Sequence, residues 1–222
     1  MGIEGLVTAV IINYKTPDLV RRVVASFRQH YPSLPLLLID NGSHDESEKV
    51  LQAFHDQQPQ TTRLLLNANN LHHGPAMDQA LREIATPFVL FLDSDCHVIN
   101  GGFVEQMLNK LQEQDSFYSV GKRISMDTRG FDVSEGMSNA ILYIRPLCMM
   151  LKRDMYLTLP PFERHGTPCL RNMRSAAERS LGLLDFPVEQ FVEHEGRGTA
   201  GRFGYQLGWR GKLNYLLHKI GL

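Results

Sequence analysis

The sequence predicts an α/β fold with a mostly parallel central sheet flanked by helices. Between residues 6 and 112, short apolar runs alternate with segments of helical periodicity, which is the order expected for parallel strands joined by right-handed helical crossovers. The runs carry few polar residues, as strands buried on both faces of a parallel sheet do. Each run ends in a polar turn, and the carboxyl ends of parallel strands meet at one edge, where ligands of open α/β sheets bind. We therefore expect the functional site at that edge.

The first two strand–helix units follow from local signals. Residues 6–12 are apolar and rich in β-branched side chains, which favours a buried strand. Thr16 is suited to cap the next helix, with Pro17 at its first position. Residues 36–39 predict the second strand, and residues 43–46 have the Ser-x-x-Glu spacing of a capping box that starts the second helix.

The third and fourth units repeat this order. Residues 63–66 predict a strand, and Pro75 is expected to open the helix that follows. Residues 88–92 are five apolar residues that run directly into a pair of aspartates, which predicts a central strand. Gly101 and Gly102 then precede a further helix.

After about residue 116 the pattern is less regular, and a mixed half is expected. We predict strands at residues 116–120 and 140–144, separated by a Gly-rich charged loop over residues 122–136. The remaining expected elements are a short strand over residues 146–151, a helix over 170–181 and a final strand over 188–192.

Length and charge indicate one domain of an ordinary globular protein. The chain has 222 residues, of which 43% are hydrophobic, enough for one sizeable core. We expect a single domain over 1–222, with a nucleotide-binding half (1–100), an acceptor half (101–201) and a basic, aromatic tail (202–222). The net charge of −1 gives no global basic field that would attract nucleic acid.

The sequence predicts a cytoplasmic protein. Its start lacks the basic and apolar regions of a signal peptide, and no apolar run approaches the roughly 18 residues of a membrane span. The three cysteines form no CxxC pair, which fits a reducing compartment. The tail 202–222 would either contact the inner face of a membrane peripherally, or pack on the domain or on a second subunit as a homodimer.

Asp93 and Asp95 follow the central strand directly and are two residues apart. Alternate side chains of an extended segment point the same way, so both carboxylates can reach one point. Hard oxygen ligands suit Mg²⁺ or Mn²⁺, which in turn can bind the phosphates of a nucleotide. The alternative is a polar turn in which the aspartates cap backbone amides.

Five segments together resemble a known family. They are residues 10–14 (Val-Ile-Ile-Asn-Tyr), 38–43 (Leu-Ile-Asp-Asn-Gly-Ser), 69–74, 91–95 (Phe-Leu-Asp-Ser-Asp) and a late histidine, His194. In this order and spacing they resemble a family 2 glycosyltransferase of the GT-A fold. The resemblance is concentrated in residues 7–100.

The resemblance implies a binding site for a nucleotide-sugar donor. Ile12, Asn13 and Tyr14 match the segment that cradles the base, on which Tyr14 would stack. Asp40 matches an aspartate that accepts hydrogen bonds from the base. Gly74 matches a glycine that lets the chain pass close to the nucleotide.

The resemblance also implies a metal site for Mn²⁺ or Mg²⁺. Asp95 matches the direct metal ligand, and Asp93 a residue that reaches the ribose or a metal-bound water, with Ser94 between them. His194 matches the histidine that completes the metal site; taken alone it reads equally as a surface or capping histidine.

Further contacts to the diphosphate are expected from basic groups. Arg197 and Arg202 follow His194 in a Gly-rich segment and would close over the phosphates, or else belong to a solvated tail. The helix N-termini at Pro17 and Pro75 would also favour negative charge. The pair His72 and His73 suggests a metal site, but adjacent residues on an extended loop point apart. We therefore interpret them as a loop pair near the substrate or at the surface.

The catalytic base is the least defined part of the site. Inverting members need a carboxylate to take the acceptor proton, and it usually lies in an acidic pair about 30 residues before the late histidine. Here residues 162–170 contain no acidic pair. The candidates are Glu163 and His165, with three explanations open: one of these is the base, the acceptor needs little deprotonation, or the protein binds a nucleotide without transfer.

The predicted function is metal-assisted transfer of a sugar, with inversion, from a UDP- or dTDP-sugar to a hydroxyl of a glycan, lipid-linked or other acceptor, in polysaccharide or glycoconjugate synthesis. One alternative is a non-catalytic nucleotide-binding or scaffold module. The other is a sugar-phosphate nucleotidyltransferase, which would need a Gly-rich, basic loop after the first strand; residues 13–17 do not provide it.

Overall fold

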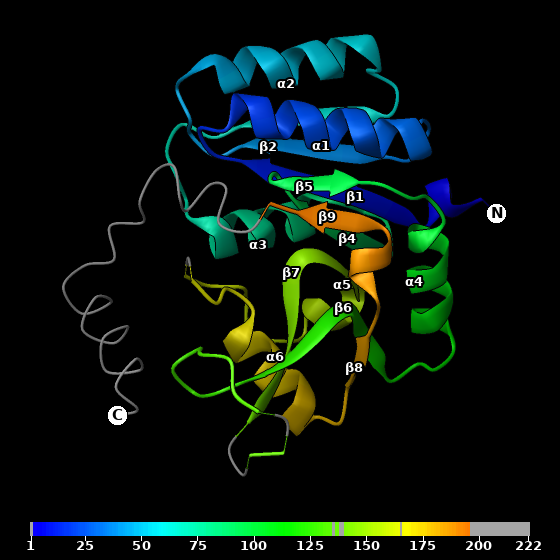
Figure 1. The fold of residues 1–222 in the computed structure, drawn as a ribbon, viewed down its shortest axis with the longest axis vertical. Helices are drawn as coiled ribbons and strands as arrows, with labels where there is room; N and C mark the ends of the chain where they lie inside the picture. Colours follow the sequence, from blue (N-terminus) through cyan, green and yellow to red (C-terminus); the bar gives the residue numbers. More distant parts are fainter. Residues whose placement is uncertain (1, 135, 138–139, 165, 196–222) are drawn as a thin grey trace.

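A seven-stranded sheet forms the centre of the molecule (Figure 1). The computed structural model describes residues 2–134, 136–137, 140–164 and 166–195. The sheet order is β3-β2-β1-β4-β7-β6-β8, and β7 alone among these strands runs antiparallel to its neighbours. The strands are β1 (Val7–Asn13), β2 (Leu36–Asp40), β3 (Thr62–Leu66), β4 (Phe88–Asp93), β6 (Phe117–Met126), β7 (Ile141–Lys152) and β8 (Gly182–Asp185). The predicted mostly parallel α/β sheet is confirmed.

Helices cover both faces of the sheet. One core lies between the sheet and helices α1 (Pro17–His30), α2 (Glu46–Gln57) and α4 (Phe103–Gln112). The other lies between the sheet and α3 (His73–Glu83), α5 (Arg153–Tyr156) and α6 (Leu170–Glu178). Two short 3₁₀ helices, η1 (Ile3–Gly5) and η2 (Val188–Gln190), complete the helical elements of the described residues.

The alternation of side chains along the central strands divides these cores. In β1, Ala9 and Ile11 face the α1 side, whereas Val10 and Ile12 face the α3 side. All seven residues of β1 are buried. An apolar run without polar alternation is therefore the pattern that a strand covered on both faces requires. Truncating the fully buried Ile11 to alanine would cost about 2–5 kcal/mol.

A small two-stranded sheet lies against the main one. Strand β5 (Cys96–Val98) pairs antiparallel with β9 (Val192–His194), so residues nearly 100 positions apart in the sequence lie side by side. Figure 1 shows this pair beside β1 and β4. The sequence did not predict β5, β8 or α5, because strands and helices of three or four residues carry no periodic signal.

Several predicted boundaries in the second half were wrong. The segment expected as a strand over 188–192 is the helix η2 followed by β9. The predicted loop over 122–136 begins later, because β6 continues to Met126. The two strands expected at 140–144 and 146–151 are the single strand β7. Pro146 is tolerated there because it falls where the ladder skips, between the pairs Ile144–Arg123 and Met149–Gly121.

Two helix starts also differ from the prediction. Asp45, not Ser43, caps α2: its Oδ1 accepts a hydrogen bond from the Ser47 amide at 2.8 Å. Thr16 does occupy the capping position of α1, but its hydroxyl donates to Asn13 Oδ1 at 2.8 Å and makes no capping bond. The hydroxyls of Thr16 and Ser43 instead donate to Asn13 and Asp40, the residues that end β1 and β2.

Within the part of the chain that the structure describes, no helix is long and apolar enough to cross a membrane.

Candidate functional site

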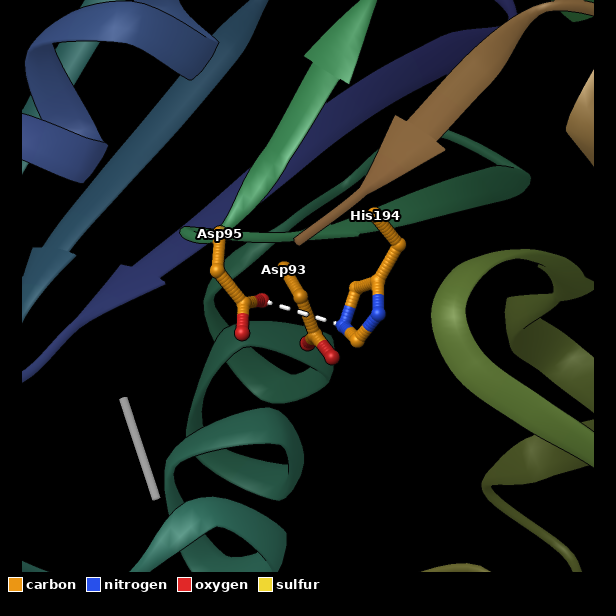
Figure 2. Close-up of side chains that lie close together, drawn as sticks. All are labelled: Asp93, Asp95 and His194. Carbon is orange, nitrogen blue, oxygen red and sulfur yellow. Dashed lines mark ion pairs between the residues drawn. The ribbon is translucent and has the colours of Figure 1, made fainter. Parts of the chain in front are cut away.

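Three side chains with metal-binding chemistry meet at the carboxyl end of β4 (Figure 2). Asp93 is the last residue of β4, Asp95 follows two residues later, and His194 ends β9. The register of the β5–β9 pair sets His194 opposite Cys96, and therefore beside Asp95. One ligand atom from each of the three residues lies within 4.8 Å of the others. Two carboxylates and an imidazole so arranged can hold a divalent cation such as Mn²⁺ or Mg²⁺.

The electrostatics of the cluster are those of a cation site. Burial raises the pKa of Asp93 above its ordinary value, His73 and His194 oppose this rise, and the charge of Asp95 adds to it. His194 Nε2 lies 3.2 Å from Asp95 Oδ1, and this hydrogen bond raises the pKa of His194 from 6.5. The two carboxylates therefore stabilise positive charge at the position of the imidazole.

The raised pKa of His194 gives a prediction about pH. In metal-free protein, the protonated His194 stabilises the folded state fully below about pH 6.5, and this contribution is lost as pH rises through the raised pKa. The difference in unfolding free energy between the wild type and His194→Gln should therefore shrink as pH rises. Urea unfolding of both proteins in EDTA, at several pH values between 5.5 and 8.5, measures this difference in free energy. A difference that stays constant across this range would contradict the assignment.

Sequence reasoning left His73 either near the substrate or at the surface, and the structure places it beside Asp93. His73 begins α3, and its Nε2 lies 3.5 Å from Asp93 Oδ1. The preceding residue, His72, has φ +69°, a left-handed conformation that costs a non-glycine residue about 1 kcal/mol or more. Because α3 begins at His73, this side chain is directed toward Asp93.

We expect His73 to orient Asp93 for a bound cation. Replacing a residue that contacts and orients a metal ligand typically lowers metal affinity by 10- to 100-fold. His73→Ala should thus weaken Mn²⁺ binding by about tenfold, measured by electron paramagnetic resonance of free Mn²⁺. His55→Ala, a histidine on α2 outside the site, is the control and should leave the affinity unchanged. Equal affinities for the His73→Ala variant and the wild type would show that the contact has no role.

Asp40 holds the turn after β2 in place. Its side chain accepts hydrogen bonds from the Ser43 amide at 2.8 Å, the Ser43 hydroxyl at 2.6 Å and Asn13 Nδ2 at 3.1 Å. Asp40 is only 1% exposed. The chain itself therefore uses most of the capacity of this carboxylate, and its predicted contact with a base stays a prediction that depends on the remaining lone pair of Oδ2.

The neighbouring Asn41 links this turn to the loop before α3. Asn41 Oδ1 accepts from the Leu71 amide at 3.1 Å, and its Nδ2 donates to Asn70 Oδ1 at 3.1 Å. Gly42 has φ +75°, and a Cβ there would lie 2.4 Å from the carbonyl carbon of Asn69. This close contact fixes the loop that leads to His73.

The predicted base-cradling residues lie on the same edge. Ile12 and Asn13 are buried, and Tyr14 is half-buried with Lys15 Nζ 5.3 Å from its ring centre. Ser94 is buried between the two aspartates, with its Oγ 3.4 Å from Thr16 Oγ1. The ends of β1, β2 and β4 are thus joined by direct polar contacts into one surface.

Position 74 requires glycine because the backbone of residues 163 and 164 passes close to it. The Gly74 amide donates to the Arg164 carbonyl at 2.9 Å, and a Cβ would lie 2.5 Å from the Glu163 carbonyl oxygen. A close approach to nucleotide, predicted for this glycine, stays a prediction. The contact brings the Glu163 loop against α3, one residue from His73. The Glu163 carboxylate itself accepts from Arg171 Nη1 at 2.8 Å at the surface.

The expected anion sites at two helix N-termini are weaker than predicted. In α3 the Gly74 amide is bound to Arg164, and Pro75 has none to offer. In α1 the second residue is Asp18, whose charge opposes that of a phosphate. The predicted residues His165, Arg197 and Arg202, and the tail 202–222, lie outside the residues that the structure describes.

The fold with this edge is that of the GT-A glycosyltransferases. A mannosyltransferase of Pyrobaculum calidifontis, solved with GDP-Man and Mn²⁺, superposes with a TM-score of 0.65 at 14% identity, over 82% of this chain and 54% of that one. S. aureus TarS residues 1–349, solved with UDP-GlcNAc, gives a TM-score of 0.61 at 12% identity, over 86% of this chain and 59% of that one.

The sequence comparison defines the family. Residues 8–179 match the profile described as "Glycosyl transferase family 2", so the chain belongs to glycosyl transferase family 2. Glycosyltransferase GlyG of Streptococcus pneumoniae is 25% identical over 123 residues, which are 55% of this chain and 40% of that protein. The teichoic acid poly(glycerol phosphate) polymerase of Staphylococcus epidermidis is 26% identical over 89 residues, 40% of this chain and 12% of that protein. The chain therefore spans less than half the length of these two relatives.

Proposed function

We propose that this chain transfers a sugar from a nucleoside diphosphate sugar to an acceptor hydroxyl, with inversion and with a divalent cation. The observation that carries the proposal is the meeting of Asp93, Asp95 and His194 at the end of β4, next to the joined turns after β1 and β2 (Figure 2). In an α/β sheet this edge is where nucleotides bind.

The residues of the cluster would divide the work. Asp95 and His194 would hold Mn²⁺ or Mg²⁺, while Asp93, oriented by His73, would bind the ribose or a water of the ion. A bound cation supplies a positive charge that offsets the negative charge developing on the departing diphosphate. Tyr14 would stack on the base, beside the turn that Asp40 fixes. We propose that Arg197 and Arg202 bind the phosphates of the donor.

We propose Glu163, with His165 as the second candidate, as the group that takes the acceptor proton. The backbone of Glu163 packs against Gly74. Gly74 follows His73, which contacts Asp93 of the cluster. The carboxylate of Glu163 lies at the surface, where Arg171 Nη1 donates to it at 2.8 Å, and a carboxylate is the kind of group that can take a proton from an acceptor hydroxyl.

The donor is proposed to be a UDP- or dTDP-sugar, and the product a polysaccharide or glycoconjugate. The solved relatives include one with GDP-Man and Mn²⁺ and one with UDP-GlcNAc, which supports a nucleoside diphosphate sugar as the class. A teichoic acid polymerase among the relatives supports a role in the synthesis of a polymer.

A thermal-shift panel tests the donor site. Binding to the folded state raises the melting temperature by mass action, so UDP, dTDP or GDP at 1 mM should stabilise the protein with Mn²⁺ and much less in EDTA. The nucleotide that gives the largest shift identifies the base. If none of the three shifts the melting temperature with Mn²⁺ present, the proposal fails.

One observation favours a second candidate, a nucleotide-binding module without transferase activity. Residues 162–170 contain no acidic pair, and Glu163 is engaged at the surface by Arg171. Release of free nucleoside diphosphate from a panel of nucleotide sugars distinguishes the two, because a module that only binds would release none.

A further inference from the structure

A cleft of about 720 Å³ opens beside the metal cluster. Its walls come from η2 and β9 on one side and from β6 and β7 on the other, with His97 of β5 and Arg22 of α1 at its margin. His194 belongs both to this cleft and to the metal cluster. The turns after β1 and β2, where the nucleotide is proposed to bind, do not contribute to its lining. The cleft and the nucleotide edge are therefore joined at the metal cluster.

We propose that this cleft binds the acceptor, and that the acceptor is an uncharged polyhydroxylated chain such as a saccharide. The inference rests on the proposed function, which requires a second substrate to reach the donor sugar at the cluster. The volume lies within the roughly 300–1,000 Å³ of ordinary ligand sites. A ligand in contact with His194 would end next to the reacting centre.

The charges in the cleft cancel in neighbouring pairs. Lys122 Nζ lies 3.0 Å from Glu189 Oε1, and both residues line the cleft. Arg22 and Glu195, also both in the lining, form a second ion pair. Arg145 pairs with Asp132, which stands just outside. Each cation of the described lining thus has a carboxylate partner.

This pairing argues against a phosphorylated acceptor. A phosphate group in the cleft would compete with a carboxylate for each cation and would lie beside that carboxylate and Glu193, with the repulsion of like charges. Hydroxyl groups, in contrast, donate to carboxylates and accept from guanidinium and ammonium groups. They can therefore bind to both members of a pair without separating them.

The apolar part of the lining completes the match. Ile124, Leu147, Val188 and Val192 present aliphatic surface between the charged pairs. Such surface suits the C–H faces of a sugar ring. Arg145 lines the same cleft as His194, the residue that the cleft shares with the metal cluster. It directly precedes the skip in the β7 ladder at Pro146, which directs this part of β7 out of the regular pairing.

Binding of defined oligosaccharides tests the inference. We would titrate the full chain, with Mn²⁺ and the nucleoside diphosphate that stabilises it, with chitotetraose, maltotetraose, mannotetraose and a tetramer of glycerol phosphate, using saturation-transfer NMR. At least one neutral tetrasaccharide should bind, more tightly than the glycerol phosphate tetramer. Arg145→Ala should weaken that binding about tenfold, the value of one charged hydrogen bond. Arg174→Ala removes a surface ion pair on α6, outside the cleft, and should leave binding unchanged.

The outcomes separate this inference from the function beneath it. Preferred binding of the glycerol phosphate tetramer, or no binding of any neutral probe, overturns the uncharged acceptor while metal-dependent nucleotide binding still supports a donor site. Binding that Arg145→Ala leaves unchanged overturns the cleft as its location. If no nucleotide stabilises the protein, the proposed function itself fails.

Discussion

Asp95→Ala should lower the rate of sugar transfer by about a thousandfold and abolish the dependence on Mn²⁺. Asp95 contributes a carboxylate that is 8% exposed and lies 3.2 Å from His194 Nε2. Its removal takes away one oxygen ligand and the hydrogen bond between Asp95 and the imidazole of His194. A loss of about 4 kcal/mol in transition-state stabilisation corresponds to a factor of a thousand. Release of nucleoside diphosphate, with and without Mn²⁺, measures the effect.

An exposed aspartate provides the control for this variant. Asp154 of α5 has a side chain that is 87% exposed and lies 3.8 Å from Arg153. Asp154→Ala removes the same charge outside the site and should keep full activity. Urea unfolding of both variants shows whether Asp95→Ala remains folded. A folded Asp95→Ala protein with unchanged rate and unchanged response to Mn²⁺ would exclude the cluster as the metal site.

The first half of the fold could be predicted because its inner strands, β1, β2 and β4, are buried on both faces. In β1 and β4 this burial leaves continuous apolar runs that end at polar turns, and the helices between them carry apolar faces of regular spacing. Errors there concern the helix caps and the three-residue strand β5. At residues 43–46 the capping-box pattern gave the wrong cap, because Ser43 was required by the carboxylate of Asp40.

The second half depends on pairings between distant residues, which local patterns do not encode. Strand β9 has three residues, and it is a strand because Cys96–Val98 lies beside it. Strand β7 was predicted in two pieces because Pro146 ordinarily interrupts a ladder, and only the skip opposite Gly121 and Arg123 accommodates it.

The candidate site shows the same division. The two aspartates could be placed together from their spacing, and the resemblance supplied His194 as their partner. His73 could not be assigned, because its direction depends on the strained turn at His72 and on the start of α3 at His73. The dominant partners of Asp40 were missed as well: hydrogen-bond capacity consumed by Ser43 and Asn13 is invisible until the turn is seen in three dimensions.

Gly42→Ala should destabilise the folded state by about 3 kcal/mol. Two independent costs contribute. The residue has φ +75°, a left-handed conformation that costs an alanine about 1 kcal/mol. A Cβ would also lie 2.4 Å from the carbonyl carbon and 2.8 Å from the Cα of Asn69, and backbone atoms cannot move aside as the end of a side chain can. The strain of this overpacking adds about 2 kcal/mol.

Gly136→Ala separates the two costs. Gly136 has φ +93°, and a Cβ there would meet no atom of the described residues within 4 Å, so this variant should lose only about 1 kcal/mol. Urea unfolding compares both variants with the wild type. Because the Asn69 backbone belongs to the loop that leads to His73, the Gly42→Ala protein should also bind Mn²⁺ more weakly, whereas Gly136→Ala should bind it normally. Equal stability losses in the two variants would mean that the loop yields to the added methyl group, and that its close contact with Gly42 does not hold His73 in position.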